Sequence, residues 1–332
     1  MALSESPHFG YLAGLSVSFL WTLASLIFTA ASRRLSPTVV NAARIGTALV
    51  LHALTHRLAT GQWVPSAPSR QVLCLAVSGV LGLTIGDQAM FHAFLSIGPR
   101  LALLVASTAP LLASAFGWLL LSESLTLQAW SGILLTVTGV AWVVLQRSDQ
   151  GGAGERPARS VRGVSLALLG AACQAGGLML SKWGMGHGNL PDAERLPPQT
   201  ATLIRMTFAA FGVAIVLSFR SIRLRKQATN DLETIKAAAR AGLATRARRD
   251  GLLLSMCGGV LGPFLGVWMS LVASDRVPIG VAQTLCSLPP VLILPLAAVL
   301  YKERIGPRAV FGAMVAVLGV VVLAAARNQA GP

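Results

Sequence analysis

Long apolar runs separated by short polar stretches dominate the chain. Each run approaches the roughly 20 residues that an α-helix needs to cross a ~30 Å hydrocarbon core. The runs predict transmembrane helices at residues 9–31, 37–56, 72–95, 100–121, 127–145, 161–181, 198–219, 251–272, 277–300 and 307–326. We expect the first helix to stay in the mature protein, because it is longer than the apolar part of a signal peptide and residues 1–8 contain no Lys or Arg.

Composition excludes two classes of protein. Of the 332 residues, 54% are hydrophobic and only 12% are charged, whereas soluble domains carry roughly 25% charged residues. The formal net charge is +15, from 27 Lys and Arg against 12 Asp and Glu. These basic residues lie between apolar runs, so they indicate membrane topology and neither a water-soluble enzyme nor a nucleic-acid-binding module.

Cysteine and histidine form no motif for a metal or cofactor. Cys74, Cys173, Cys257 and Cys286 lie in predicted spans without C-x-x-C spacing, which is typical of small packing residues. The five histidines are dispersed along the chain, so they do not complete a zinc ligand set. No P-loop pattern is present either, and we expect no cofactor and no direct use of ATP.

Two copies of one pattern make up the chain. Residues 79–145 align with residues 259–325 without a gap, at an offset of 180. Matched pairs include Gly79 and Gly259, Gly82 and Gly262, Gly86 and Gly266, Pro110 and Pro290, Glu123 and Glu303, Gly132 and Gly312, and Gly139 and Gly319. Matched Pro, Glu and Gly positions are much harder to obtain by chance than matched small apolar residues.

The start of each copy aligns at a shorter offset of 161. Pro37 and Pro198 are each followed seven residues later by an arginine, Arg44 and Arg205. The longer segment 220–250 absorbs the difference between the two offsets. We therefore predict an all-α polytopic membrane protein with about ten transmembrane helices: a five-helix repeat at 9–146, a linker at 147–160 and a second five-helix repeat at 161–326.

These motifs resemble the EamA repeat of the drug/metabolite transporter superfamily. The shared features are the Pro and Arg of the second helix, the Gly-rich third helix, the Pro of the fourth, a Glu in the next turn and Gly-x6-Gly in the fifth. The turn from Tyr301 to Ile305 is similar to that family's Leu-Gly-Glu-Arg-Leu. The resemblance covers both halves and implies a ten-helix permease whose two inverted repeats enclose a central cavity.

The first helix of each repeat helps line that cavity in the family. It often shows Trp-Gly followed by Lys, whereas here the first copy has Trp21-Thr22 and the second has Cys173-Gln174 and Lys182. The resemblance thus makes Trp21, Gln174 and Lys182 candidates for contact with a substrate.

Loop charges predict an orientation that differs from the one the resemblance implies. Apart from Arg44 and Arg205 inside spans, 19 Lys and Arg lie on the loops after odd-numbered spans and 6 on the other side. The positive-inside rule then puts both termini outside the cytoplasm, whereas the family resemblance puts them inside. Nine of the 19 lie between Arg220 and Arg249.

The same basic segment has two interpretations of equal weight. A capping-box pattern at Asn230 and Glu233 precedes apolar residues at near-helical spacing. The segment is therefore either an amphipathic helix on anionic lipid head groups or a solvated loop.

Matched helix breakers point to a binding region, since irregular backbone at membrane depth is tolerated where it faces protein or water. Pro110 and the pair Pro289-Pro290 form such a match. Neighbouring polar residues are candidates for the cavity wall: Ser107, Thr108, Gln283, Thr284 and Ser287. The alternative is a packed kink whose free carbonyls bond to those hydroxyl groups. For the glycine faces of the third and eighth spans, close helix packing is the favoured interpretation.

Asp87 is the only acid well inside a predicted span. A carboxylate costs about 2.5–3.5 kcal/mol on membrane-insertion scales, so Asp87 must face a cavity, pair with a cation or be protonated. It is either a proton-coupling or substrate-binding group, or the structural partner of Arg44, Arg100 or His92. The second copy has Val267 at this position, and the asymmetry favours a specific task.

Four repeated charged residues are interpreted as scaffold. Glu123 and Glu303 lie in the turns before the last helix of each repeat, where a carboxylate at a helix start complements the helix dipole. Arg44 and Arg205 are expected to reach the interface or to cap carbonyls of a neighbouring helix.

The favoured function is a secondary transporter in the cell membrane, moving a small polar or amphiphilic metabolite around a midplane site, with proton coupling as a further hypothesis. The expected partners are this substrate and membrane lipids, with a homodimer left open and nucleic acid excluded. The alternatives are a lipid-modifying membrane enzyme, which needs clustered His, Asp or Glu, and a scaffold that does not transport.

Overall fold

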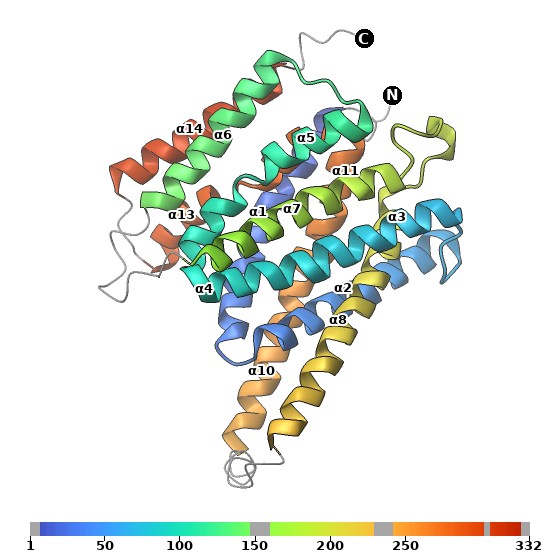
Figure 1. Ribbon diagram of the computed structural model, residues 1–332, viewed down its shortest axis with the longest axis vertical. Coiled ribbons are helices and arrows are strands. Elements are labelled where there is room, and N and C mark those ends of the chain that lie inside the picture. Colours follow the sequence, from blue (N-terminus) through green and yellow to red (C-terminus); the bar gives the residue numbers. More distant parts are fainter. Residues whose placement is uncertain (1–6, 147–159, 229–241, 302–305, 327–332) are drawn as a thin grey trace.

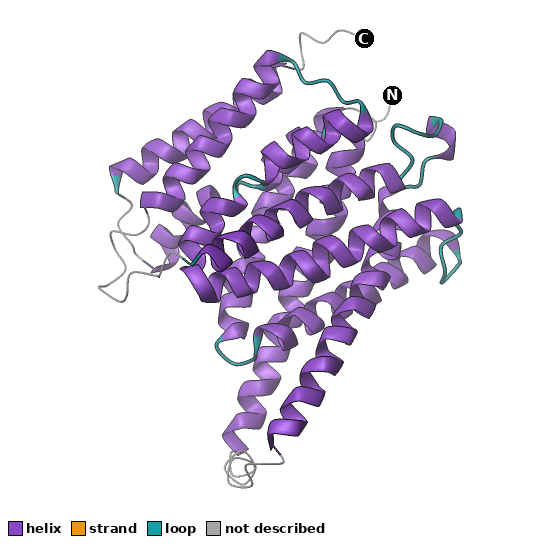
Figure 2. Cartoon of the chain, viewed as in Figure 1, coloured by secondary structure: helices purple, strands orange, loops and turns teal. Residues whose placement is uncertain are grey.

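The computed structural model describes residues 7–146, 160–228, 242–301 and 306–326, and within these ranges it contains helices and no strand (Figures 1 and 2). In the first half the helices are α1 (Pro7–Ser32), α2 (Pro37–Thr60), α3 (Ser69–Gly79), η2 (Val80–Gly86), α4 (Asp87–Ala106), α5 (Ala109–Leu121) and α6 (Leu127–Gln146). In the second half they are α7 (Val161–Gly184), η4 (Asp192–Glu194), α8 (Pro198–Ala228), α10 (Gly242–Gly259), η5 (Val260–Gly266), α11 (Val267–Arg276), α12 (Ile279–Cys286), α13 (Pro289–Tyr301) and α14 (Pro307–Ala326).

Ten of the described helical segments are long and apolar enough to cross a membrane, which confirms the predicted number of spans. The third span runs through α3, η2 and the first part of α4, from Ser69 to Gly98. Gly98 ends it with φ 78°, a left-handed conformation that favours glycine. Because each repeat has an odd number of spans, the second repeat enters the membrane from the opposite side.

Three sequence predictions fall wholly or mainly on residues outside the described ranges. They are the linker at 147–160, of which only Ser160 is described, the amphipathic helix that begins at Asn230, and the turn around Glu303.

Matched π-helical segments interrupt the third and eighth spans. Both η2 and η5 are seven residues long, and they begin at residues 80 and 260, so the sequence offset of 180 is also a structural offset. In η5, Pro263 removes a backbone donor. Sequence patterns predicted regular helices here, because hydropathy does not distinguish a π-turn from an α-turn. Such segments are frequent at functional sites.

The fourth and ninth spans are broken at matched places as well. The first break lies between Ala106 and Ala109, and the second between Cys286 and Pro289. Pro110 lies in the first turn of α5, and Pro289 and Pro290 begin α13. At that position a proline loses no helical hydrogen bond, so these prolines start the second half of each span.

The last helices of the two repeats, α6 and α14, form one closely packed pair at the upper left of Figure 1. A Cβ atom added at Gly139 would lie 2.3 Å from the backbone nitrogen of Ala316. One added at Gly319 would lie 2.5 Å from the backbone nitrogen of Thr136. The Gly-x6-Gly pattern therefore serves close contact of two helix backbones.

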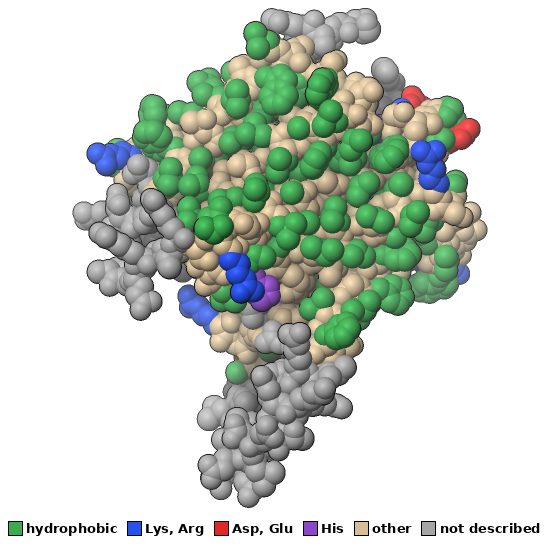
Figure 3. All heavy atoms as spheres, in the orientation of Figure 1, with side chains coloured by type: hydrophobic (Ala, Val, Ile, Leu, Met, Phe, Trp, Pro, Cys, Tyr) green, Lys and Arg blue, Asp and Glu red, His purple; other side chains and the backbone are tan. Residues whose placement is uncertain are grey.

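Apolar side chains cover the face of the bundle seen in Figure 3, with charged groups near its margins. Large hydrophobic side chains stay exposed on several helices, including Leu95 at 79% and Trp118 at 66%. A surface of this kind fits a hydrocarbon surrounding, in which the helices need no polar outer face.

Candidate functional site

A cluster of buried and half-buried polar side chains lies where the two repeats meet. Arg44 extends from α2 and its Nη2 forms an ion pair with Oδ2 of Asp87, the first residue after the π-helix η2. The Nε2 of Gln174 on α7 donates to the other carboxylate oxygen of Asp87 at 3.4 Å. Of the partners that the sequence left open for Asp87, the structure selects Arg44.

Arg44 is held by three further side chains of the first repeat. Its Nε donates to Oδ1 of Asn41 at 2.7 Å. The guanidinium carbon lies 5.8 Å from the ring centroid of Trp21 and 5.4 Å from that of Phe28, both within cation–π range. Trp21, a cavity candidate from the sequence, therefore lies beside Arg44, which sequence reasoning had treated as scaffold.

Arg205 has the equivalent place in the second repeat but a different environment. It is 3% exposed, and its Nε has no hydrogen-bond partner among the described residues. No described carboxylate lies within 4.0 Å of its guanidinium. Its Nη2 lies against η2, 2.8 Å from where a Cβ atom of Gly82 would be. The repeat alone predicts a scaffold role for Arg205, but the second repeat has Val267 where the first has Asp87, and this sequence difference indicates a separate role for Arg205.

Reciprocal backbone contacts place the two arginines. A Cβ atom at Gly79, before η2, would lie 2.2 Å from the backbone oxygen of Arg205. At the matched Gly259, before η5, a Cβ atom would lie 3.0 Å from the backbone oxygen of Arg44. The small residues predicted to serve close packing thus bring each arginine backbone against the interrupted span of the other repeat.

A second ionic contact joins the two repeats. It lies nearer one side of the bundle, the side on which α1 begins and α14 ends. Lys182 of α7 forms an ion pair with Oε1 of Glu123 at 2.6 Å, and its Nζ donates to the backbone oxygen of Val277 at 2.8 Å. The backbone N–H of Ile279, the first residue of α12, donates to Oε2 of Glu123 at 2.8 Å. Glu123 was expected to complement a helix within its own repeat, but it caps a helix of the other repeat.

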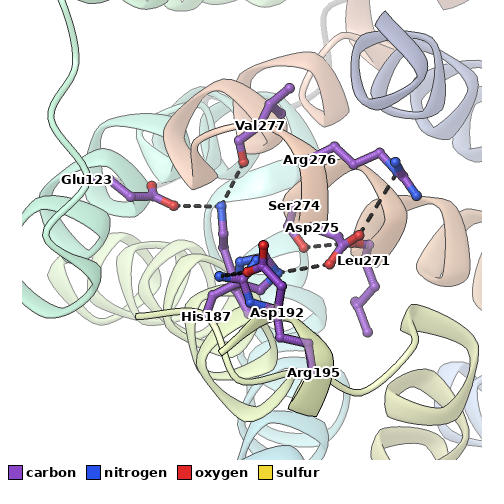
Figure 4. Close-up of polar contacts among 10 residues, drawn as sticks. Glu123, His187, Asp192, Arg195, Leu271, Ser274, Asp275, Arg276 and Val277 are labelled. Atoms are coloured by element: carbon purple, nitrogen blue, oxygen red, sulfur yellow. Dashed lines mark hydrogen bonds and ion pairs between the residues drawn. The ribbon is translucent and has the colours of Figure 1, made fainter. Parts of the chain in front are cut away.

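Further charged side chains lie around an open pocket on the same side of the bundle. Nε2 of His187 lies 2.8 Å from Oδ1 of Asp275, and Arg195 pairs with Asp192 at 2.6 Å (Figure 4). The pocket has a volume of about 430 Å³. Its wall consists of Asp192, Arg195, Leu196, Pro197, Pro198, Asp275 and Arg276.

The polar candidates at the helix breaks make mostly local contacts. Ser107 donates to the backbone oxygen of Leu104 at 2.6 Å, and Thr108 to that of Val105 at 2.7 Å. In the second repeat, Thr284 and Ser287 donate to carbonyls four and three residues earlier, and Gln283 is half-buried in α12. No described hydrogen bond links these residues to the Arg44–Asp87 pair. The described residues also contain no group of three potential metal ligands among His, Cys, Asp and Glu.

Ten apolar spans in two copies, with an ionic centre between them, define a polytopic membrane protein built on a duplicated five-helix unit. The chain matches the EamA-like transporter family over residues 8–145 and again over residues 161–325, and it belongs to that family. It is an integral membrane protein of a transporter family. A solved structure, described only as a crystal structure of a protein, aligns with a TM-score of 0.69 over 97% of this chain and 99% of its own, at 19% identity. That likeness shows the fold, and no curated protein matches the chain.

Proposed function

We propose that the protein is a secondary transporter in the cell membrane that moves a small polar or amphiphilic metabolite by alternating access. The observation that carries the proposal is the group formed by the buried Arg44 and Arg205 with the half-buried Asp87 and Gln174. Arg44 and Arg205 each lie seven residues beyond the first proline of their helix, about 10 Å into the span at 1.5 Å per residue. Charged groups at such depth are expensive and mark pathways for substrates or ions.

The Glu123–Lys182 contact supports a gate at one end of this pathway. It ties the turn after α5, in the first repeat, to α7 and to the start of α12, both in the second repeat. Rocking of one repeat against the other breaks these contacts and opens that side. The matched π-helices and the matched breaks in the fourth and ninth spans supply backbone that bends with little loss of hydrogen bonding.

A flux assay tests this function. Purified protein in proteoliposomes is supplied with amino acids, sugars and cationic dyes, with and without a proton gradient. We expect saturable flux of at least one class, and lipid vesicles without protein are the control. Absence of flux from every class, in protein whose melting curve shows a folded state, contradicts the proposal.

Proton coupling is a separate part of the proposal and rests on Asp87. If Asp87 carries the coupled proton, Asp87→Asn abolishes the pH dependence of flux while Asp87→Glu retains it. An unchanged pH dependence in Asp87→Asn removes proton coupling and leaves Asp87 as the partner of Arg44.

A further inference from the structure

Two arginines that the repeat makes equivalent have unequal numbers of partners. Arg44 has the carboxylate of Asp87, the amide oxygen of Asn41 and two aromatic rings. Arg205 is buried to a similar degree, yet its Nε has no hydrogen-bond partner among the described residues, and no described carboxylate lies within ion-pair distance of its guanidinium. The residue that corresponds to Asp87 is Val267, since 87 plus the offset of 180 is 267. Arg205 therefore lacks the group that its counterpart has.

The charges of this centre do not cancel. Arginine stays protonated in proteins, so Arg44 and Arg205 contribute two positive charges against the single negative charge that Asp87 can supply. The remaining charge of +1 is buried, and an uncompensated charge in a membrane interior is strongly unfavourable. Asp87 makes its direct contacts with Arg44 and Gln174, and no described contact brings its carboxylate within ion-pair distance of Arg205.

We infer that Arg205 binds a carboxylate of the transported substrate, which takes the place in the second repeat that Asp87 holds in the first. The inference rests on the proposed transport function and names its substrate class: small monocarboxylic acids and zwitterions such as amino acids. The planar guanidinium matches a carboxylate with two parallel hydrogen bonds.

A single negative charge fits the centre better than a double one. One carboxylate brings the sum over Arg44, Arg205, Asp87 and substrate to zero. A phosphate monoester, with roughly −1.5 to −2 at pH 7, leaves the buried centre with excess negative charge. A cationic substrate raises the buried positive charge to +2. A zwitterion leaves the sum at +1 when both of its charges lie in the centre, so its ammonium group is expected to lie outside the centre, away from Arg205.

Matched pairs of compounds that differ only in the carboxylate test the inference. Purified protein is titrated with leucine and leucinamide, with benzoate and benzamide, and with glycerol 3-phosphate, and the melting temperature is recorded. We expect an acid of at least one pair to stabilise the protein and its amide not to. Arg205→Gln should weaken the binding of that acid roughly 10- to 100-fold, the range for a hydrogen bond to a charged group. The exposed Arg57→Gln is the matched control and should bind as the wild type does.

Arg205→Lys keeps the positive charge but loses the planar guanidinium. This second variant keeps the test decisive if Arg205→Gln fails to fold. We expect binding between that of the wild type and that of Arg205→Gln. Equal stabilisation by acid and amide, stabilisation by neither, or binding unchanged in Arg205→Gln overturns the inference. Stronger binding of glycerol 3-phosphate than of any carboxylate overturns it in favour of a phosphate.

Flux measurements separate this inference from the proposed function. Transport of neutral or cationic compounds that is indifferent to Arg205→Gln overturns the carboxylate assignment and leaves the transporter intact. Carboxylate binding that depends on Arg205, in protein that shows no flux of any compound, supports the binding site and contradicts the transport function.

Discussion

Arg44 and Arg205 occupy equivalent places in the two repeats, yet among the described residues one forms an ion pair with a carboxylate of the protein and the other does not. Both lie seven residues after a proline, and both rest with their backbone against a glycine that precedes a π-helix. The difference between them arises at one matched position, which is Asp87 in the first repeat and Val267 in the second. The duplication thus accounts for the shared scaffold, and the acid that is present in only one copy accounts for the difference between the two arginines.

The largest effect is expected from Asp87→Asn. This change leaves Arg44 buried without its counter-ion, and loss of one partner of a buried pair costs about 3–5 kcal/mol. Thermal unfolding in detergent should show a marked loss of stability, whereas Val267→Asn at the matched position should have a clearly smaller effect. Equal effects at the two positions contradict the difference between the arginines.

A smaller loss is expected when the contact between the repeats is cut at Glu123. Glu123→Gln can still accept from the N–H of Ile279, but it loses the charge that faces Lys182. Hydrogen bonds to charged groups contribute about 1.5–3 kcal/mol. The test uses a variant that lacks the native cysteines and carries Val277→Cys as its single thiol. Maleimide should label this thiol faster when Glu123→Gln is added to the same variant. An unchanged labelling rate indicates that this contact does not close the pathway.

The glycines before the π-helices should respond unequally to alanine. A Cβ atom at Gly79 would lie 2.2 Å from the backbone oxygen of Arg205, whereas one at Gly259 would lie 3.0 Å from that of Arg44. Overpacking costs about 1–3 kcal/mol of stability. The loss of stability in Gly79→Ala should lie at the upper end of this range, and the loss in Gly259→Ala should be smaller. Gly46→Ala, where no heavy atom lies within 4 Å, is the control. The reverse order in melting temperature contradicts the packing described.

The smallest effect is expected at the break in the fourth span. Thr108→Val removes a hydrogen bond to the carbonyl of Val105, worth about 0.5–1.5 kcal/mol. If the only role of this hydroxyl is to donate to a free carbonyl at the helix break, the substitution lowers stability slightly and leaves flux unchanged. A selective loss of flux at unchanged stability shows instead that Thr108 contacts the substrate.

Local patterns were sufficient for the spans and the repeats. A run of about 20 apolar residues has one stable form in a membrane, and matched Pro, Gly and Arg positions reveal a duplication without any knowledge of contacts. Glu123 shows the limit: its presence in both repeats indicated a structural role, but the helix that it caps begins 156 residues later in the chain, at Ile279.

The ionic centre was only partly predictable for the same reason. Asp87 stands out in the sequence because a carboxylate inside a span needs a partner, but the sequence offers three candidate partners, Arg44, Arg100 and His92. The tertiary structure pairs Asp87 with Arg44, whose backbone also lies against Gly259 of the other repeat. The contrast between Arg44, which has a carboxylate partner, and Arg205, which has none among the described residues, depends on contacts that the sequence does not contain.

Val267→Asp tests the central claim most directly, because it supplies the second repeat with the carboxylate that it lacks. Binding of the acid of each matched pair is measured by thermal stabilisation in Val267→Asp, in Val267→Asn and in the wild type. We expect the aspartate variant to be folded and to lose carboxylate binding by at least about 10-fold, the equivalent of one charged hydrogen bond, while the asparagine variant still binds. Carboxylate binding of wild-type strength in Val267→Asp contradicts the account.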